Sequence, residues 1–344
     1  MRPSSLIRVN ADFHPRPISR RAWFEAAGTA ALSVGPALHA QAAAVPIVDT
    51  HIHLFDQTRP QGAPYSGGGR NTEPALPPRY RRLATPLGIV AAIEIEASPW
   101  LEDNLWVLET IETDSLLVGT VGNLQPEKPD FREYLERFHK NPRFLGLRYG
   151  NLWGYQLVEQ TGNPVFLEGL KLLAQAGLTL DTANPRPDLI AAAVKVKDKV
   201  PGLRMVIDHT AHLAPGPAAA GPLSRVSSPE RAALERNLRD LAQRPGVFFK
   251  LSEIMRMDAA GRPIVDPSAY RPTLDYLMDL FGEDRVIFGS DWPNADAVDH
   301  LDAIVQIVRD YFAARSRAAQ EKYFWKNSIQ AYRWPKRAAN QPQL

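Results

Sequence analysis

The chain of 344 residues contains no cysteine. This absence excludes a disulfide framework, a thiolate metal site and a cysteine nucleophile, so any bound metal must be held by His, Asp, Glu or Lys. An excess of one charge is also lacking, because 40 Lys and Arg face 38 Asp and Glu and no block of like charge stands out. Nothing therefore points to nucleic acid or to an acidic membrane surface, and a small molecule is the expected partner.

The chain also lacks a stable membrane span in its apolar N-terminal run, Ala26–Leu38, which is too short and too rich in Ala and Gly. Arginines precede this run and the small residues 40–44 follow it, which is the order of a secretory signal. Within it, Ser19–Phe24 resembles the twin-arginine export motif, although Glu25 stands where a basic residue is often found. We expect residues 1–44 to be a cleaved export signal that leads to the periplasm. The alternative is an ordinary amphipathic helix.

Eight short apolar, β-branched runs alternate with helix-length amphipathic segments in the rest of the chain. Their near-continuous hydrophobicity is typical of parallel strands that are covered on both faces. We therefore predict an α/β protein with a single (β/α)8 TIM barrel over residues 45–334. A doubly wound open sheet is the alternative, but no G-x-G-x-x-G or Walker-type loop follows any run. The runs are Val45–His53, Gly88–Glu96, Leu116–Leu124, Phe144–Tyr149, Leu178–Ala183, Arg204–His209, Val247–Ser252 and Arg285–Ser290.

Two of the segments between these runs have clear helical signals. In Asn163–Ala176, Asn163 can cap the first turn and Pro164 suits that turn, while Gly177 stops the helix. The segment Pro129–Lys140 carries apolar residues along one side of a helix. We expect a helix over each of these segments.

Three connections that follow predicted strands are long and rich in Pro, Gly and Ser. In a barrel such loops lie at the carboxyl ends of the strands, where active sites are built. We expect them to form lids and substrate walls, and we expect the tail of residues 335–344 to be frayed. The three connections are 56–80, 211–229 and 256–268.

His51 and His53 end the first predicted strand. The period of a strand places both imidazoles on one face together with Asp49, while Ile52 and Leu54 point the other way and pack under the helices. The two imidazoles can then converge on one ion or one substrate atom. A bare His-x-His pattern is nevertheless a weak motif that is as often structural.

The last strand ends in the segment Phe288–Pro293, which contains Asp291. A carboxylate that directly follows a buried apolar run is costly to bury unless it has a binding partner or a functional role. The structural alternatives are a helix cap or a salt-bridged loop residue. Closure of the barrel makes the first and eighth strands neighbours. We therefore expect Asp291 to meet His51 and His53.

Polar residues also gather at the ends of the other predicted strands. Such groups are costly inside a packed barrel, so their clustering at one end indicates a site. We expect Glu94, Asp208 and Glu253 to be ordinary salt-bridge partners outside the pocket. His209 is expected to be functional, and His212 to be a loop residue. The set comprises Glu94, Glu96, Arg148, Asp181, Asp208, His209, Lys250, Ser252 and Glu253.

With these motifs in view, the chain resembles the amidohydrolase superfamily, specifically the amidohydrolase-related branch that contains lactonases and decarboxylases. The likeness covers nearly all of the mature chain and is strongest to the lactonase group, whose members open sugar lactones and pyrone or muconolactone-type cyclic esters. The resemblance implies a TIM barrel and a hydrolase acting on ester bonds. The segments that carry it are Ile47–His53, Glu96–Trp100, Gly146–Arg148, Ile207–His209 and Phe288–Pro293.

The family's functional residues match this chain only in part. Metal-rich members carry a histidine on the fifth strand and a bridging Lys or Glu on the fourth, whereas Asp181 and Arg148 stand there. A two-metal centre is therefore not expected. The resemblance allows one divalent ion, with zinc the expected one, on His51, His53 and Asp291, or a metal-free site in which these residues bind water and carbonyl directly. The catalytic candidates that it implies are Asp291, His51, His53 and His209.

Hydrolysis of a lactone is the function that we predict from these residues. Asp291 would take a proton from the attacking water and pass one to the leaving oxygen. The oxyanion would be stabilised by the ion, or by the imidazoles with Lys250 or Arg148. Arg148 could instead clamp a substrate carboxylate, and we expect the substrate to be anionic or sugar-derived. The expected substrate contacts are Arg148, Lys250, Asp181, Glu96 and Trp292.

Two other functions remain open at this point. A metal-dependent decarboxylase of an aromatic or muconate-type acid would use the aspartate to protonate a carbanion. An exported binding protein for a small acid or sugar would use the same polar strand ends only as ligand contacts. Release of CO2 would identify the first, and tight binding without turnover the second.

Overall fold

The computed structural model describes residues 44–65, 73–183, 185–210, 228–256, 258, 260, 262–294 and 301–344. The predicted export signal up to residue 43 lies outside these residues, as do His212 and most of the predicted loop 211–229. In the described part of the chain, no helix is long and apolar enough to cross a membrane.

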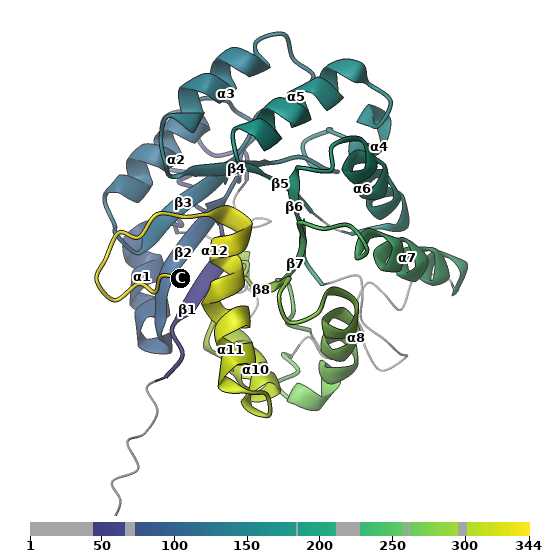
Figure 1. The fold of residues 1–344 in the computed structure, drawn as a ribbon. Helices are drawn as coiled ribbons and strands as arrows, with labels where there is room; N and C mark the ends of the chain where they lie inside the picture. Colours follow the sequence, from purple (N-terminus) through teal and green to yellow (C-terminus); the bar gives the residue numbers. More distant parts are fainter. Residues whose placement is uncertain are drawn as a thin grey trace, which may run out of the picture. The chain divides into compact units, whose positions relative to one another are not determined.

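Eight parallel strands form one sheet in the order of the sequence. The sheet closes where Ile52 bridges Trp292, next to the ends of the first and last strands. Helices surround the strands on the outside (Figure 1). The predicted (β/α)8 barrel is therefore confirmed, and each strand lies within the run predicted for it. The strands are β1 (Ile47–Ile52), β2 (Ile89–Ile95), β3 (Leu117–Gly122), β4 (Phe144–Arg148), β5 (Thr179–Thr182), β6 (Arg204–Asp208), β7 (Val247–Leu251) and β8 (Val286–Phe288).

The two helices with the clearest sequence signals are present. Asn163 caps α5, because its Oδ1 accepts the backbone N–H of Val165 at 3.0 Å, and Gly177 follows in a left-handed conformation. The described helices are α1 (Pro77–Ala84), η2 (Thr85–Leu87), α2 (Asp103–Glu112), α3 (Phe131–His139), α4 (Leu157–Gln160), α5 (Pro164–Gln175), α6 (Pro187–Lys199), α7 (Ser228–Leu241), η4 (Pro267–Ala269), α8 (Arg271–Phe281), α10 (Leu301–Ala313), α11 (Arg317–Glu321), η5 (Lys322–Lys326) and α12 (Asn327–Tyr332).

Apolar residues cover both faces of the strands. One cluster lies between the strands and the helices and includes Ile52 and Leu54, as predicted. A second cluster lies inside the barrel and includes Val48, Phe248 and, from α12, Tyr332. Burial on both faces accounts for the near-continuous hydrophobic runs in the sequence.

The prediction that Asp49 shares a face with the two histidines is wrong. The register of β1 shifts between Asp49 and Ile52, and this irregularity breaks the alternation of side chains. Val48 and His51 therefore both face the barrel interior. The Asp49 carboxylate accepts the hydroxyl of Tyr80 on α1 at 2.8 Å, and burial raises its pKa.

The tail of residues 335–344 is ordered by contacts with the barrel, contrary to the expectation that it is frayed. Arg337 donates to the carbonyl of Leu117 at 2.6 Å. Gln341 is 2% exposed and donates to the carbonyl of Ser115 at 2.8 Å. These carbonyls lie at the start of β3, where the tail supplies their hydrogen-bond donors.

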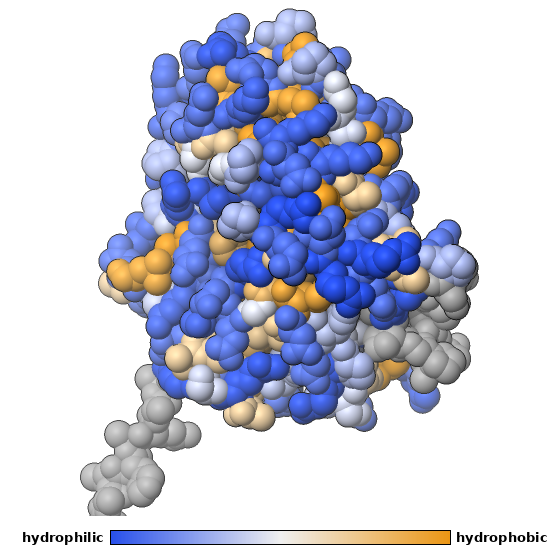
Figure 2. Space-filling model, turned by 45° about the vertical axis from the view of Figure 1, so that its right-hand side comes forward, coloured by the Kyte–Doolittle hydropathy of each residue, from blue (hydrophilic) through white to orange (hydrophobic). Residues whose placement is uncertain are grey.

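Hydrophilic residues predominate on the face of the molecule drawn in Figure 2, and the apolar residues there lie in small separate groups. Such scattered apolar residues are normal on a protein surface.

Candidate active site

A cavity of about 410 Å³ opens at the carboxyl ends of the strands. Active sites of TIM barrels form at this end, because the loops that follow the strands meet there. The cavity is large enough for a small ring-shaped molecule. Its lining residues are His53, Tyr65, Ala97, Arg148, Asn151, Leu152, Trp153, Ala183, His209, Glu253, Asp291 and Asn294.

Asp291 meets both strand-end histidines, as the sequence predicts. Its Oδ1 lies 3.2 Å from Nε2 of His53 and 3.5 Å from Nε2 of His51. All three side chains are buried. Closure of the barrel thus brings residues more than two hundred positions apart into one cluster.

The hydrogen bonds of His53 define its tautomer. Nδ1 lies 2.8 Å from the carbonyl oxygen of Ile95, which can only accept, so Nδ1 carries a proton. In a neutral ring Nε2 then presents a lone pair to the Asp291 carboxylate, and two acceptors face each other. A second proton or a cation must lie between them. The site is therefore built to hold positive charge beside Asp291.

His209, at the end of β6, completes the cluster. Its ring lies 4.7 Å from that of His51, and its Nδ1 is 3.0 Å from the Ser252 hydroxyl. Burial lowers the pKa of His209 to about 3 and that of His51 well below its ordinary value. Both rings are therefore neutral at pH 7, the form in which imidazole binds a metal.

These residues fit a divalent metal ion. The potential ligand atoms of His51, His209 and Asp291 all lie within 4.8 Å of one another. Nε2 of His51 is buried without a hydrogen-bond partner in the described residues, as expected for a metal ligand. Three nitrogen and oxygen donors with room for a further ligand are typical of catalytic sites. The cluster differs from the predicted ligand set in one member, since His209 stands in place of His53.

Lys250 and Asp181 lie beneath the cavity and do not line it, although the sequence predicts them as substrate contacts. Lys250 is 0% exposed, and its Nζ lies 2.9 Å from Asp208 and 3.1 Å from Asp181. It also lies 3.5 Å from Nδ1 of His51. Burial raises the pKa of Asp208 to about 7, against the lowering effect of Lys250. This layer supports His51 from below.

Trp292, another predicted substrate contact, also lies away from the cavity. It is 0% exposed and packs against Tyr80, with ring centroids 5.1 Å apart. Its carbonyl accepts the backbone N–H of His53 at 2.7 Å. Trp292 therefore holds β1 against the end of β8.

Arg148 lines the cavity, whereas Glu96 stands behind it. Arg148 donates from Nε to Glu96 Oε1 at 2.8 Å and from Nη2 to the Glu96 carbonyl at 2.7 Å. The indole N–H of Trp153 donates to the other carboxylate oxygen at 2.9 Å. One buried carboxylate thus orients two residues of the cavity wall.

Glu253 was expected outside the pocket, but it lies on the cavity wall. Its Oε1 is 3.8 Å from Nδ1 of His209. Burial, followed by repulsion from Asp291, raises its pKa to about 8. The turn after β7, where Glu253 has a φ of 49°, directs it inward.

The loops supply wall residues that no strand pattern marks. Tyr65 donates its hydroxyl to Asn294 at 2.6 Å, and Asn294 donates to Oδ2 of Asp291 at 3.0 Å. Asn151 and Trp153 come from the connection after β4, which is not among the three long loops.

Backbone strain is concentrated at the cavity. In the described part of the chain, five residues other than glycine have positive φ, and four of them line this cavity. Such conformations cost of order 1–3 kcal/mol each and persist where the surroundings enforce them, commonly at functional sites. The four are Trp153 (55°), His209 (76°), Glu253 (49°) and Asp291 (67°).

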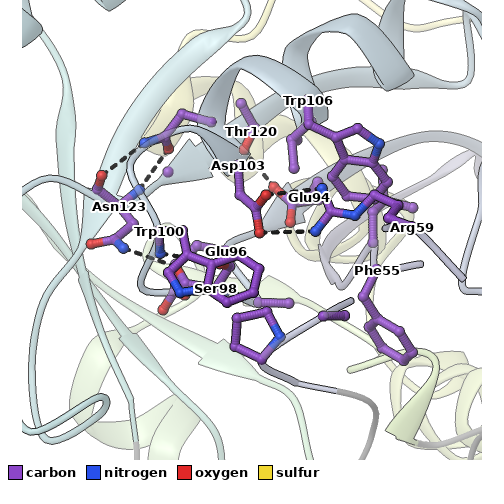
Figure 3. Close-up of a pocket in the computed structure, with 17 residues that line it drawn as sticks. Phe55, Arg59, Glu94, Glu96, Ser98, Trp100, Asp103, Trp106, Thr120 and Asn123 are labelled. Atoms are coloured by element: carbon purple, nitrogen blue, oxygen red, sulfur yellow. Dashed lines mark hydrogen bonds and ion pairs between the residues drawn. The ribbon is translucent and has the colours of Figure 1, made fainter. Parts of the chain in front are cut away.

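A second cavity, of about 20 Å³, lies between β2, β3 and α2 (Figure 3). It has room for about one water molecule. Glu94 faces it, accepts a hydrogen bond from the Thr120 hydroxyl and lies outside the larger cavity, as expected, but it forms no salt bridge with the described residues. Burial raises the pKa of Glu94 to about 8. This cavity is too small for a substrate.

Comparisons with known proteins agree with this architecture. A family model described as Amidohydrolase matches residues 48–334. The chain is similar to L-fucono-1,5-lactonases of Burkholderia ambifaria (26% identity over 214 residues, 62% of this chain and 68% of the relative) and Burkholderia multivorans (24% over 287 residues, 81% and 92%). A solved amidohydrolase from Burkholderia multivorans with bound zinc is 20% identical, with a TM-score of 0.70 over 84% of this chain and 100% of that chain.

The family match covers most of the chain and includes both ends of the barrel, from β1 to α12. It contains every residue that lines the larger cavity. The family resemblance predicted from the sequence is therefore confirmed: the chain belongs to the amidohydrolase family and is a hydrolase.

Proposed function

We propose that this protein hydrolyses a lactone or a similar cyclic ester of a small acid or sugar acid. The observation that carries the proposal is the meeting of the Asp291 carboxylate with His51, His53 and His209 at a cavity of about 410 Å³. The names of the two lactonases to which the chain is similar support an ester bond as the target.

Asp291 is the proposed general base. Burial acts to raise its pKa, but the hydrogen bonds with His53 and Asn294 outweigh this effect and lower it. The carboxylate is therefore ionised at neutral pH and can accept a proton from the attacking water. Asn294 holds Oδ2 at 3.0 Å, which orients Oδ1 toward the imidazoles. The same carboxyl group then returns the proton to the leaving alkoxide.

His51, His209 and Asp291 would hold one divalent ion, which we propose to be zinc. When bound, the ion would polarise the ester carbonyl as a Lewis acid. His53 remains beside Asp291 with its ring fixed on the Ile95 carbonyl. Arg148, at the end of β4, lines the same cavity and can donate a hydrogen bond to a substrate oxygen.

A pH-indicator screen of lactones with the purified mature protein tests this proposal, with metal analysis and a chelated sample in parallel. We expect acid release from at least one lactone, about one equivalent of zinc and loss of activity after chelation that zinc restores. Release of CO2 from an aromatic acid, or tight binding of a lactone without turnover, would contradict lactone hydrolysis. Full activity in stripped protein would contradict the metal site alone.

We also propose that residues 1–44 direct export to the periplasm by the twin-arginine route. The basis is the order of charged, apolar and small residues around Arg20 and Arg21. Replacing both with lysine keeps the charge, yet should leave the uncleaved precursor in the cytoplasm. Replacing Arg8 and Arg16 with lysine is the matched control and should not affect export. Fractionation and the mature N-terminal sequence measure both outcomes.

A further inference from the structure

Glu96 lies at the end of β2 with its side chain 5% exposed, and both of its carboxylate oxygens are engaged. Oε1 accepts Nε of Arg148 at 2.8 Å. Oε2 accepts the indole N–H of Trp153 at 2.9 Å and the backbone N–H of Ser98 at 3.1 Å. Figure 3 shows Glu96 next to Ser98, on the side of the small cavity. Glu96 therefore reaches the substrate cavity only through its two partners.

Arg148 is the single Lys or Arg among the described residues that line the substrate cavity. Two of its three nitrogens, Nε and Nη2, are bound to Glu96. Within the described part of the chain, Nη1 makes no hydrogen bond and is left for a ligand. Its positive charge is compensated by the Glu96 carboxylate at 2.8 Å, and the same wall carries the Asp291 carboxylate. Arg148 by itself therefore offers a substrate carboxylate little net attraction.

Trp153 supplies the flat part of the same wall. Its backbone has a φ of 55°, and its indole is tied to Glu96 by the ring N–H. Trp153 is half-buried, and an indole whose N–H is satisfied can present its apolar face to a ligand ring. Fixing the ring before binding lowers the entropy cost of binding.

We propose that Glu96 is a positioning residue that makes the cavity selective for neutral, hydroxylated lactone rings over carboxylated ones. The inference rests on the proposed lactone hydrolysis and adds the charge of the preferred substrate. Glu96 compensates Arg148, so that Nη1 donates to a hydroxyl or ester oxygen and does not clamp a carboxylate. It also holds Trp153 where a ring can stack.

The test compares an aldono-1,5-lactone with the aldaric lactone that has a carboxylate in place of its terminal hydroxymethyl group. Both kcat/KM values are measured for the wild type and for Glu96→Gln, which keeps the shape of the side chain and removes its charge. We expect the wild type to favour the neutral ring at least tenfold. In Glu96→Gln the ratio should shift by about tenfold or more toward the carboxylated ring, equivalent to about 1.4 kcal/mol.

Glu94→Gln is the control for the substitution itself, since it makes the same side-chain replacement two residues earlier on β2, outside the cavity, where the carboxyl group is mostly protonated at pH 7. Its ratio should equal that of the wild type. Trp153→Phe is a second variant that keeps an aromatic wall and the Glu96 charge. It should weaken the binding of the neutral ring and leave the charge preference in place.

Binding of the corresponding lactams, which share the ring but resist hydrolysis, is measured by calorimetry on the same proteins. A wild-type preference for the neutral lactam that Glu96→Gln reduces would support the inference even if no lactone were hydrolysed, and would then contradict the proposed function alone. A wild-type preference for the carboxylated ring, or a ratio that Glu96→Gln leaves unchanged, would overturn the inference.

Discussion

The contact between Asp291 and His53 indicates which chemistry the site supports. The carbonyl of Ile95 assigns the proton to Nδ1 of His53, so Nε2 and the carboxylate at 3.2 Å need a positive charge between them. His51 offers a second nitrogen to the same carboxylate at 3.5 Å. The imidazole nitrogens of His51 and His53 beside the Asp291 carboxylate therefore favour a site that binds a cation and transfers a proton.

Asp291→Asn should reduce kcat on a confirmed lactone by at least about 10³-fold, because the amide cannot accept the proton of the attacking water. The fold should be retained, since Asn294 can still bond to the side chain. Asp188→Asn, in an exposed ion pair with Arg186, is the control and should keep wild-type kcat. Steady-state kinetics with circular dichroism measures both. Wild-type turnover in Asp291→Asn would contradict the assigned base.

Glu94 should make stability depend on pH. Burial raises its pKa in the folded state to about 8 from an ordinary value of 4.5, so folding favours the protonated form. Its contribution is complete below pH 4.5 and is lost as pH rises through 8. Between pH 5.5 and 8.5 the wild type should lose about 3 kcal/mol of unfolding free energy that Glu94→Gln does not lose. Urea titrations at both pH values measure this difference, and equal pH dependence would contradict it.

The ends of β1, β6 and β8 carry the cluster, and local features of β1 and β8 decide where its side chains point. The register shift in β1 turns Asp49 outward and His51 inward. Across the barrel seam, Gly289 follows β8 directly behind His51. A Cβ at this position would lie 2.7 Å from the Cβ of His51 and 3.1 Å from Lys250 Cδ. The close approach of β1 and β8 therefore requires glycine here.

Gly289→Ala should destabilise the protein by about 1–3 kcal/mol, because overpacking forces β1 and β8 apart. The same displacement of His51 should lower metal affinity and kcat. Gly202→Ala is the matched control, since a Cβ there meets nothing within 4 Å, and it should be near neutral. Thermal unfolding and zinc titration measure both variants. Unchanged stability and zinc binding in Gly289→Ala would contradict the close packing.

On the scale of the whole molecule, the C-terminal segment closes the barrel at the end opposite the site. Tyr332 lies inside the barrel and donates to Asp181, which pairs with Lys250 beneath His51. Residues 335–344 then continue to the start of β3. The end of the chain is thus linked to the active site through buried contacts.

Deletion of residues 335–344 should lower the unfolding free energy by about 2 kcal/mol or more, because several backbone carbonyls lose their donors. Deletion of residues 342–344 keeps Arg337 and Gln341 and should have little effect. Thermal melts of the two truncated proteins measure the contrast. If both melted at the temperature of the full chain, the tail would not stabilise the barrel.

Local patterns in the sequence determined the eight strands, the closed barrel and the meeting of Asp291 with His51 and His53. These features follow from hydrophobic runs of strand length and from barrel closure, which makes the first and last strands neighbours. Side-chain types then limited the chemistry to nitrogen and oxygen ligands.

The tertiary structure alone decided which polar residues face the substrate. Lys250 and Asp181 lie below the cavity, whereas Glu253 and Trp153 enter it through turns with positive φ. Their directions depend on bulges, strained turns and loop paths, which are set by contacts between distant segments and leave no periodic signal. For this reason the meeting of Asp291 with the histidines was foreseen, but most of the cavity wall was not.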